Sequence, residues 1–387
     1  MIIHEFEAAF ELMKKLSDEG FDAVVVGGAV RDTLLGAPVH DVDVATSAKP
    51  EQMKQVFKKT VDIGIEHGTI LVLDAKEPVE VTTYRTEGTY VDHRRPDQVN
   101  FVTDLAEDLK RRDFTINAMA LRLNNEVVDL FGGQQDLKAK KIRAVGIASE
   151  RFQEDALRML RAVRFSAKLN FTIEEETLRA MTVHASDLQF IAMERIKAEF
   201  DQIVRSAHPY VGFKQLKETT LAAYVPGNFE KIEQWKSFSA SSTEVGWAMF
   251  SYLENDPNLV KAYRGSNKES QFVQHVLRAI ELLHEPIENR SLFDIEQAVW
   301  QAAVMIYNHV EHGEISIEEI VQRKRALPIA SKQQLAVTGK HLLEWTGQKG
   351  GPWLKQALDQ LVTDILEGRV QNEEQHIKGW VERECRF

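Results

Sequence analysis

Residues 23–46 read AVVVGGAVRDTLLGAPVHDVDVAT, and this stretch decides the fold of the N-terminal part of the chain. The β-branched run 23–26 predicts a strand that ends in a tight Gly-Gly turn at 27–28. A helix is expected to start near Val30, and the alternating segment 41–44, DVDV, predicts a second strand. A strand, a turn, a helix and another strand in this order indicate a mixed α/β domain.

The same periodicities extend this prediction along the chain. Residues 5–19 predict an amphipathic helix, and strands are expected at 69–73, 79–83 and 126–130. From about Arg151 onward, helical periodicity dominates. The sequence therefore predicts an α+β protein, with a mixed α/β head followed by an elongated, all-helical neck, body and tail. The expected boundaries are 1–148 for the head, 149–207 for the neck, 208–330 for the body and 331–387 for the tail.

Composition limits the classes of protein to consider. The 387 residues contain one cysteine, Cys385, which excludes a disulfide framework and a cysteine-based zinc site within one chain. No apolar run approaches the roughly 20 residues of a membrane helix, and the N-terminus lacks a signal pattern, so we expect a cytoplasmic protein. The formal net charge of −11 disfavours a broad, nonspecific grip on nucleic acid but is compatible with a local basic groove.

The Gly-Gly turn and the residues after it predict a phosphate site. Paired glycines let backbone N–H groups approach a phosphate closely, and a following helix N-terminus favours negative charge. We therefore expect Gly28 to lie at a phosphate, where Arg31 can add a fork-shaped contact. Gly-Gly turns without a ligand are common, so this motif by itself leaves a plain turn as the alternative.

Three carboxylates predict a metal-dependent reaction. Asp41 and Asp43 lie two residues apart in the expected strand, which places both side chains on one face of the sheet. Such carboxylates repel each other unless a cation lies between them, and oxygen ligands of this kind suit Mg²⁺. Glu80, between two valines, is the candidate third carboxylate. A solvated strand edge for the aspartates and an outward-facing Glu80 are the alternatives.

These motifs carry a resemblance to a known family. GGAVRD at 27–32, followed by DVDVAT at 41–46, resembles the signature of DNA polymerase β-type nucleotidyltransferases. More narrowly, the pattern is similar to the bacterial class II CCA-adding enzymes, which are tRNA nucleotidyltransferases. His40 stands where similar enzymes often have glycine or a basic residue. The resemblance implies that Asp41 and Asp43 bind Mg²⁺ and that both take part in catalysis with Glu80.

The segment RRDFTINAMA at 111–120 is similar to the same family. The resemblance implies that it holds the sugar and phosphates of a nucleotide and prefers ribose over deoxyribose. Arg112 offers donors to phosphate, while Asp113 and Asn117 can engage a ribose hydroxyl. A solvated Arg-Arg-Asp surface is the alternative for this segment in isolation.

The segment EDALRMLRAVRF at 154–165 is rich in helix formers. Asp155 and Arg158 are three residues apart, so they are expected to be neighbours on one face of a helix that Arg161 and Arg164 continue. Cytosine and adenine both carry an exocyclic amine beside a ring-nitrogen acceptor, which a carboxylate and a guanidinium can read together. Uracil and guanine would leave these groups unpaired. An intrahelical salt bridge with exposed arginines is the alternative.

The resemblance extends to this segment, which is similar to the family motif Glu-Asp-x-x-Arg. It implies that Asp155 and Arg158 act as an amino-acid template for the base. It also implies that Arg161 and Arg164 reach the triphosphate and that Glu154 positions neighbouring groups.

Two further regions match the family. The polar segment 86–96, TEGTYVDHRRP, resembles a flexible loop that the family needs to move from adding C to adding A; a surface connector is the alternative. The C-terminal region resembles the tRNA-binding tail, where phosphates can be contacted by Lys324, Arg325, Lys340, Lys349 and Lys355. A solvated surface charge is the alternative for each of them.

We therefore predict template-independent addition of C, C and A to the 3′ end of tRNA from CTP and ATP, by a two-metal nucleotidyl transfer with Mg²⁺ and with base choice by an Asp–Arg pair. The expected partners are tRNA, ATP and CTP, with no membrane, and the oligomeric state stays open. The nearest alternative is an A-adding enzyme that completes CC-ended tRNA. Further alternatives are a poly(A) polymerase, a non-catalytic RNA-binding protein and a small-molecule transferase.

Overall fold

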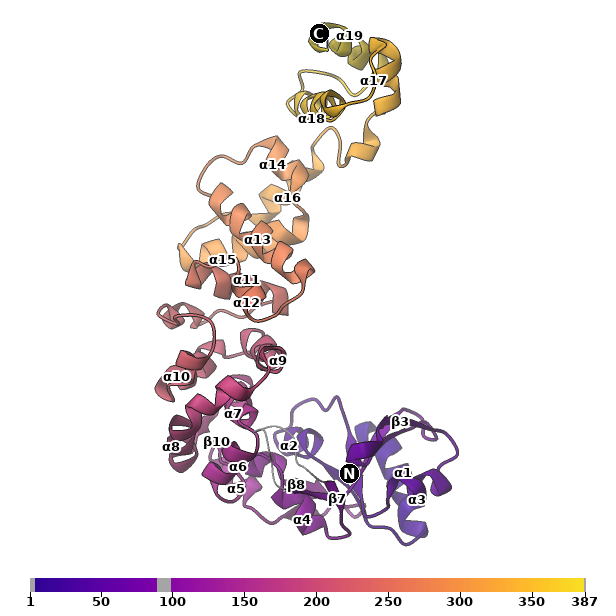
Figure 1. The fold of residues 1–387 in the computed structure, drawn as a ribbon, viewed down its shortest axis with the longest axis vertical. Helices are drawn as coiled ribbons and strands as arrows, with labels where there is room; N and C mark the ends of the chain where they lie inside the picture. The colour runs from indigo at the N-terminus through magenta and orange to yellow at the C-terminus, as the bar shows by residue number, and fades with distance from the viewer. Residues whose placement is uncertain (1–3, 89–98, 386–387) are drawn as a thin grey trace. The chain divides into compact units, whose positions relative to one another are not determined.

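The computed structural model describes residues 4–88 and 99–385. The chain divides into two compact units, Met1–Gly246 with Lys261–Gly265, and Trp247–Val260 with Ser266–Phe387. Strands belong to the indigo-to-magenta part of the chain in Figure 1, and the orange and yellow part is helical. The α+β fold class is thus confirmed. The predicted division into head, neck, body and tail stays a prediction.

A seven-stranded sheet forms the centre of the head, in the order β3-β4-β5-β2-β1-β8-β9. Strands β2 and β5 pair in parallel, and the other neighbours are antiparallel. The strands are β1 (Ala23–Val26), β2 (Asp43–Thr46), β3 (Thr60–Gly64), β4 (Thr69–Val72), β5 (Val79–Thr83), β8 (Met119–Leu121) and β9 (Val127–Asp129).

The β-branched runs predicted β1, β4, β5 and β9 to within a residue or two. Strand β2 begins at Asp43, so the prediction that Asp41 also lies in it was wrong. Strands β3 and β8 were missed. The middle of β3 is exposed on both faces, and β8 has no β-branched residue, so neither has the pattern of a half-buried strand.

Helices cover the sheet and lead out of it. The helices of the head are α1 (Glu7–Asp18), α2 (Gly28–Leu34), α3 (Pro50–Val56), α4 (Leu105–Lys110) and α5 (Gly133–Lys138). A short hairpin pairs β6 (Arg85–Glu87) with β7 (Val99–Phe101). Helix α1 contacts β1, β2 and α3, and its residues Ala9, Leu12, Met13 and Leu16 are buried, as the amphipathic pattern predicts.

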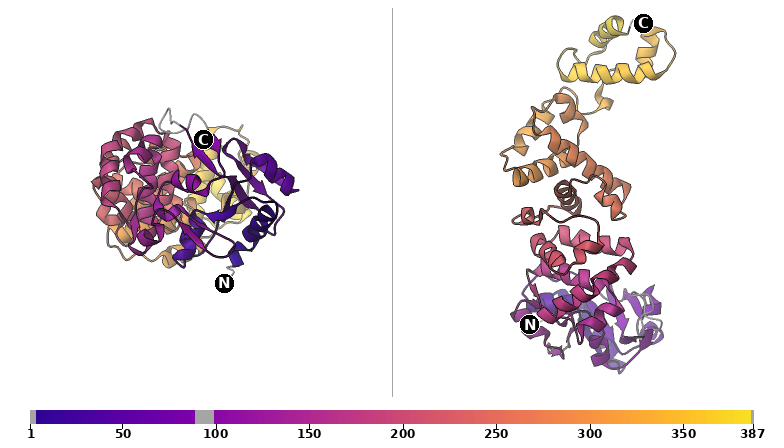
Figure 2. Two further views of the ribbon diagram at one scale, coloured as in Figure 1. Left: turned by 90° about the horizontal axis from the view of Figure 1, so that it is seen from below. Right: turned by 60° about the vertical axis from the view of Figure 1, so that its left-hand side comes forward.

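The next helices pack around α7. They are α6 (Ala148–Glu154), α7 (Leu157–Leu169), α8 (Glu175–His184), α9 (Met193–Val204) and α10 (Pro209–Glu218). Helix α7 contacts both α9 and α10, and α6 contacts α8. A short parallel pair of β10 (Lys141–Ile142) and β11 (Thr172–Ile173) interrupts the predicted all-helical neck. Figure 2 shows these helices in magenta to rose next to the purple strands in both views.

The rest of the described chain is helical. Its α-helices are α11 (Thr243–Glu254), α12 (Leu259–Ala262), α13 (Asn267–Leu282), α14 (Asn289–Asp294), α15 (Gln297–Val310), α16 (Ile317–Arg325), α17 (Gly339–Thr346), α18 (Pro352–Leu366) and α19 (Glu374–Glu384). None of the helices in the described residues is long and apolar enough to cross a membrane.

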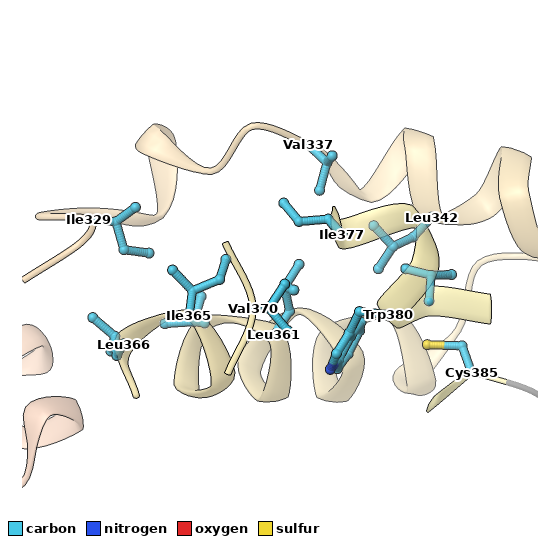
Figure 3. Packing of buried hydrophobic residues seen from close by; sticks show 12 residues of the cluster. Ile329, Val337, Leu342, Leu361, Ile365, Leu366, Val370, Ile377, Trp380 and Cys385 are labelled. Carbon is cyan, nitrogen blue, oxygen red and sulfur yellow. The ribbon is translucent and has the colours of Figure 1, made fainter. Parts of the chain in front are cut away.

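An apolar cluster holds the last three helices together (Figure 3). Leu361 and Ile365 from α18 pack with Ile377 and Trp380 from α19, and all four side chains are buried. One polar group enters this cluster: Trp380 Nε1 donates to the buried Asp364 carboxylate at 2.7 Å. The hydrogen bond satisfies the indole N–H, so the aromatic ring can pack in the core without an unpaired donor.

Lys324 was a candidate phosphate contact, with a solvated charge as the alternative, and the structure gives it a third role. Its ammonium donates to the backbone carbonyls of Phe293 at 3.3 Å and Ile295 at 2.8 Å, and also to that of Leu292. These carbonyls lie at the C-terminal end of α14, where carbonyls lack helical partners and attract a cation. Lys324 is therefore a helix cap.

Candidate functional site

A hollow of about 640 Å³ lies between the head and helices α7 and α9. Its lining contains nine arginine or lysine side chains and five aspartates, and we call it the basic hollow. Eleven of the twelve predicted site residues line it, and the exception is Glu80. Residues that were not predicted but also line it include Arg85, Arg111, Lys168 and Arg195. A positive excess therefore gathers here in a chain whose net charge is −11.

The Gly-Gly turn between β1 and α2 forms part of the wall. Gly27 has φ = +74° and ψ = −133°, a conformation that side chains with a Cβ rarely adopt. A Cβ on Gly28 would lie 3.5 Å from Arg31 Nη2, so the arginine packs against this turn. The turn thus brings backbone and a guanidinium to the same side of the hollow.

Arg31 is buried and held by two partners. Its Nε and Nη2 donate to the two oxygens of Asp32 at 2.8 and 2.9 Å, and its Nη1 donates to Asn117 Oδ1 at 2.7 Å. Asn117 Nδ2 in turn donates to Asp113 at 3.3 Å. These bonds fix the guanidinium from α2 against the 3₁₀ turn Thr115–Asn117, with its orientation set before any ligand binds.

The same line of contacts continues to α7. Arg161 Nε donates to Asp113 Oδ2 at 2.8 Å, and the Phe114 backbone N–H donates to Oδ1 at 2.8 Å. Burial raises the pKa of Asp113, but the Arg161 guanidinium and these hydrogen bonds outweigh it and lower the pKa overall. Asp113 therefore stays ionised and joins the 111–120 segment to α7. Asp113 and Asn117, the two residues predicted to meet a ribose hydroxyl, are hydrogen-bonded to each other.

The chain breaks its helix at Asp155, which corrects the prediction of one continuous helix over 154–165. Helix α6 ends at Glu154, Asp155 has extended backbone (φ = −138°, ψ = 104°), and α7 begins at Leu157. The Asp155 carboxylate accepts from the Leu157 backbone N–H at 3.0 Å, and this local bond holds the turn between the two helices. Asp155 and Arg158 are consequently not neighbours within one helix.

Each of these two residues has a strong partner of its own. Asp155 Oδ2 accepts from Arg195 Nη2 at 2.9 Å, an ion pair that links the junction to α9. Arg158 Nη1 donates to Glu154 at 2.5 Å, as expected of a Glu154 that positions its neighbours, and Arg158 Nη2 donates to the Arg111 carbonyl at 3.2 Å. Arg195 is forty residues from Asp155, so local spacing gave no signal for this pair.

Arg164 and the aromatic Phe165 complete this wall. Arg164 forms an ion pair with the buried Glu199 of α9 at 2.7 Å. Burial raises the pKa of Glu199, while Arg164 lowers it by a smaller amount. The Phe165 ring lies beneath the guanidinium carbons of Arg31, Arg161 and Arg164, at 5.3, 5.7 and 4.3 Å from its centroid. The ring face attracts these cations and helps to keep them together.

The predicted metal ligands lie where two hollows meet. A second hollow, of about 650 Å³, shares Asp41 and Asp43 with the basic one. Its lining has six carboxylates and one lysine, and we call it the acidic hollow. Strand pairing puts Asp43 directly beside Glu80, and Glu80 lines the acidic hollow. Glu80 therefore lies beside Asp43 with an exposed side chain, and its predicted part in catalysis stays a prediction.

The electrostatics of this corner fit a divalent cation. The protein around Asp43 raises its pKa by desolvation, and Glu80 and Asp41 raise it further, while Arg112 lowers it. A cation would relieve the repulsion among these carboxylates. In residues 4–88 and 99–385, no group of three or more histidine, cysteine or acidic side chains is arranged as a metal cage. Mg²⁺ is commonly bound by only one or two carboxylates together with waters and substrate phosphates, so the pair matches its usual mode.

The segment 86–96 largely lies outside the described residues. Thr86 belongs to the hairpin strand β6, and the rest of that prediction stays untested.

Known proteins resemble this chain over its whole length. A CCA-adding enzyme of Streptococcus thermophilus is 40% identical over 390 residues, covering 98% of this chain and 97% of the relative. The chain belongs to the CCA-adding enzyme family. A CCA-adding enzyme of Lacticaseibacillus paracasei is 41% identical and covers 95% of this chain and 94% of its own.

Family models and a solved structure agree with this membership. The model described as "Poly A polymerase head domain" matches residues 23–143, and a tRNA nucleotidyltransferase domain 2 model matches residues 238–381. The crystal structure of Bacillus stearothermophilus CCA-adding enzyme in complex with CTP superposes with a TM-score of 0.91 at 35% identity, covering 99% and 98% of the two chains. The sequence resemblance to this family is therefore confirmed.

Proposed function

We propose that this chain adds C, C and A to the 3′ end of tRNA without a nucleic-acid template, using CTP and ATP. The observation that carries the proposal is the basic hollow, whose positive wall ends at the carboxylates Asp41 and Asp43. A hollow of about 640 Å³ has the size expected of a small-molecule site, and its excess of cations suits a triphosphate. The relatives' names and a relative's complex with CTP support the same function.

The residues around the hollow divide the work of binding. Arg31, Arg112, Arg161 and Arg164 lie where they can neutralise the phosphates, and Gly28 lies where its backbone N–H can approach one. Hydrogen bonds orient Arg31, Arg112 and Arg161 in the absence of substrate, and an ion pair with Glu199 orients Arg164. Such pre-orientation lowers the cost of assembling the transition state, because the charges need not reorganise during the reaction.

Base choice falls to Asp155 and Arg158 in this proposal. An ionised carboxylate offers about four acceptor positions, and Asp155 uses two of them for Leu157 and Arg195. It can accept from the exocyclic amine of cytosine or adenine, while Arg158 donates to the neighbouring ring nitrogen. Uracil and guanine present a carbonyl in place of the amine, so the carboxylate would face another acceptor. The pair therefore selects the two bases that CCA synthesis needs.

In the transfer, the tRNA 3′-oxygen bonds to the α-phosphorus, the bond from that phosphorus to the bridging oxygen breaks, and pyrophosphate leaves. The proton of the 3′-hydroxyl passes to solvent. Asp41 and Asp43 would bind Mg²⁺, which supplies charge neutralisation and activates the hydroxyl in such reactions. Glu80, beside Asp43, adds negative charge that strengthens the hold of this corner on a cation. The positive wall balances the charge that develops on the leaving pyrophosphate.

The proposal includes the predicted four-part division and a cytoplasmic site of action. The head provides chemistry, the neck selects the nucleotide, and the body and tail bind tRNA. The single cysteine fits a reducing compartment.

The test is extension of three tRNA transcripts that end before CCA, after C, and after CC, with CTP, ATP or both and Mg²⁺. Extension of the first transcript to full CCA supports the proposal. Extension of the CC-ended transcript alone, with ATP, would make this an A-adding enzyme. Failure to extend any transcript while tRNA still binds would favour a non-catalytic RNA-binding protein.

A further inference from the structure

One lysine in the basic hollow has no place in the function described above. Lys168 lies on α7, lines the hollow and keeps about half of its side chain exposed (54%). Positions 158, 161 and 168 are separated by three and seven residues, so they follow one stripe along the helix. Ten residues of helix rise about 15 Å, which is comparable to the length of an extended nucleoside triphosphate.

The charges along this stripe are compensated unequally. Arg158 and Arg161 each have a close carboxylate partner, Glu154 and Asp113 respectively. Within residues 4–88 and 99–385, the ion-pair partner of Lys168 is Asp32, at 4.0 Å. The two oxygens of Asp32 already accept from Arg31 at 2.8 and 2.9 Å. Lys168 is thus the member of the stripe whose charge is least satisfied by protein.

The surroundings of Lys168 favour an anion. Burial lowers its pKa, and the nearby Arg31 and Arg164 cations lower it further, while Asp32 and Asp41 act in the opposite direction. A group of like charges around a partly exposed ammonium is relieved when an anion enters between them. Phosphate oxygens are strong acceptors for such donors.

The position of Lys168 along α7 indicates which phosphate of a nucleotide it would meet. Arg158 lies at the end of the stripe that is assigned to the base, and Arg161 and Arg164 follow toward Lys168. We propose that Lys168 binds the terminal phosphate of the incoming nucleotide and the same phosphate in the pyrophosphate leaving group. This inference rests on the proposed function and extends it to a residue at the far end of the site.

A phosphate of the tRNA backbone could supply the same chemistry, so the experiment separates the two sources. Binding of ATP, ADP and AMP to the full-length protein without tRNA is measured for the unchanged chain and for Lys168→Met, Lys168→Arg and Lys217→Met. Lys217 is an exposed lysine of α10, the helix that packs against α7, and serves as the matched control.

We expect Lys168→Met to weaken ATP binding about tenfold, to weaken ADP binding less and to leave AMP binding unchanged. Lys168→Arg should restore most of the affinity, and Lys217→Met should match the unchanged chain. Inhibition of extension by pyrophosphate should weaken in parallel, with the preference for CTP over UTP unaltered.

Equal losses for ATP and AMP would overturn the inference, because a terminal-phosphate contact cannot affect AMP. A rise in the KM for tRNA with unchanged ATP affinity would also overturn it and would assign the lysine to the RNA backbone. Extension of tRNA by the unchanged chain is measured in the same series, so the proposed function can stand even if this inference fails.

Discussion

The two hollows that meet at Asp41 and Asp43 are almost equal in volume and opposite in charge. The basic one has nine cationic and five acidic side chains, and the acidic one has one lysine and six carboxylates. The cations of the first come largely from α7 and from the 111–120 segment, whereas the carboxylates of the second come from the N-terminus and from around β5. The net charge of the whole chain, −11, therefore does not describe the local charge of either hollow.

This contrast in charge determines on which side of Asp41 and Asp43 the phosphates of a nucleotide are expected to bind. Phosphates are attracted to one side of the carboxylate pair and repelled from the other. The following substitutions test the contrast, beginning with the wall that the hollows share.

Asp43→Asn should cause the largest change. The substitution removes one of the two charges that we propose hold a cation at the junction, so kcat for tRNA extension should fall by about 10³-fold. Tm and the affinity for tRNA should change little, because Asp43 lies at an accessible strand end. The control is Asp62→Asn, which removes an exposed aspartate from β3 of the same sheet. Near-normal extension by Asp43→Asn would contradict the proposal that Asp43 binds Mg²⁺.

Arg158→Lys acts on the basic wall alone. Lysine keeps the charge but loses the planar fork, so discrimination of CTP against UTP should fall by about ten- to a hundredfold. The ratio of kcat/KM for the two nucleotides measures the effect, and Arg179→Lys at an exposed position of α8 is the control. An unchanged ratio would mean that Arg158 supports the wall without reading the base.

Asp113→Asn tests the network beneath that wall. The pKa of Asp113 is lowered in the folded state, so its stabilising contribution is present above the unfolded pKa, near pH 4, and is lost as pH falls through the folded pKa. The variant should be less stable by about 2 kcal/mol at pH 7. The difference in Tm should shrink below about pH 4, whereas exposed Asp18→Asn should show a small, constant difference. A pH-independent gap would contradict the ionised pair.

Glu77→Lys should have the smallest effect and tests the acidic wall. The reversal places a cation in the acidic hollow, yet the KM for CTP should change by less than about twofold, because solvent and salt screen exposed charges beyond about 8 Å. A severalfold tighter KM would show that the triphosphate also occupies the acidic side, and the contrast between the hollows would lose its functional meaning.

Local sequence patterns predicted the parts of the fold that depend on local physics. The β-branched runs predicted β1 and β5, and the amphipathic pattern predicted α1. The break at Asp155 was missed because the surrounding residues favour helix, although an aspartate two residues before the first buried leucine is also a capping pattern. The break is stabilised here because the Asp155 carboxylate also accepts a hydrogen bond from Arg195 of α9.

The candidate site was predictable where its residues share a segment. Eleven of twelve predicted residues line the basic hollow because their motifs are short and contiguous. Arg195 could not be found in this way, because only folding brings α9 beside the α6–α7 junction. Lys168 could have been found, since it extends the stripe of Arg158 and Arg161 by two turns. The role of Lys324 as a cap depends on α14, which lies about thirty residues away, so composition alone could not separate it from a phosphate contact.

The line of contacts from Asp32 through Arg31, Asn117 and Asp113 to Arg161 has a consequence for how the site responds to change. The three inner members, Arg31, Asn117 and Asp113, each contact two neighbours, so removing one of them also frees its partners. Energies of such groups are not additive, and double-mutant cycles between contacting members should give coupling of about 0.5–3 kcal/mol. This line of residues in the basic hollow should therefore behave thermodynamically as a single cooperative unit, although its members come from three separate stretches of chain.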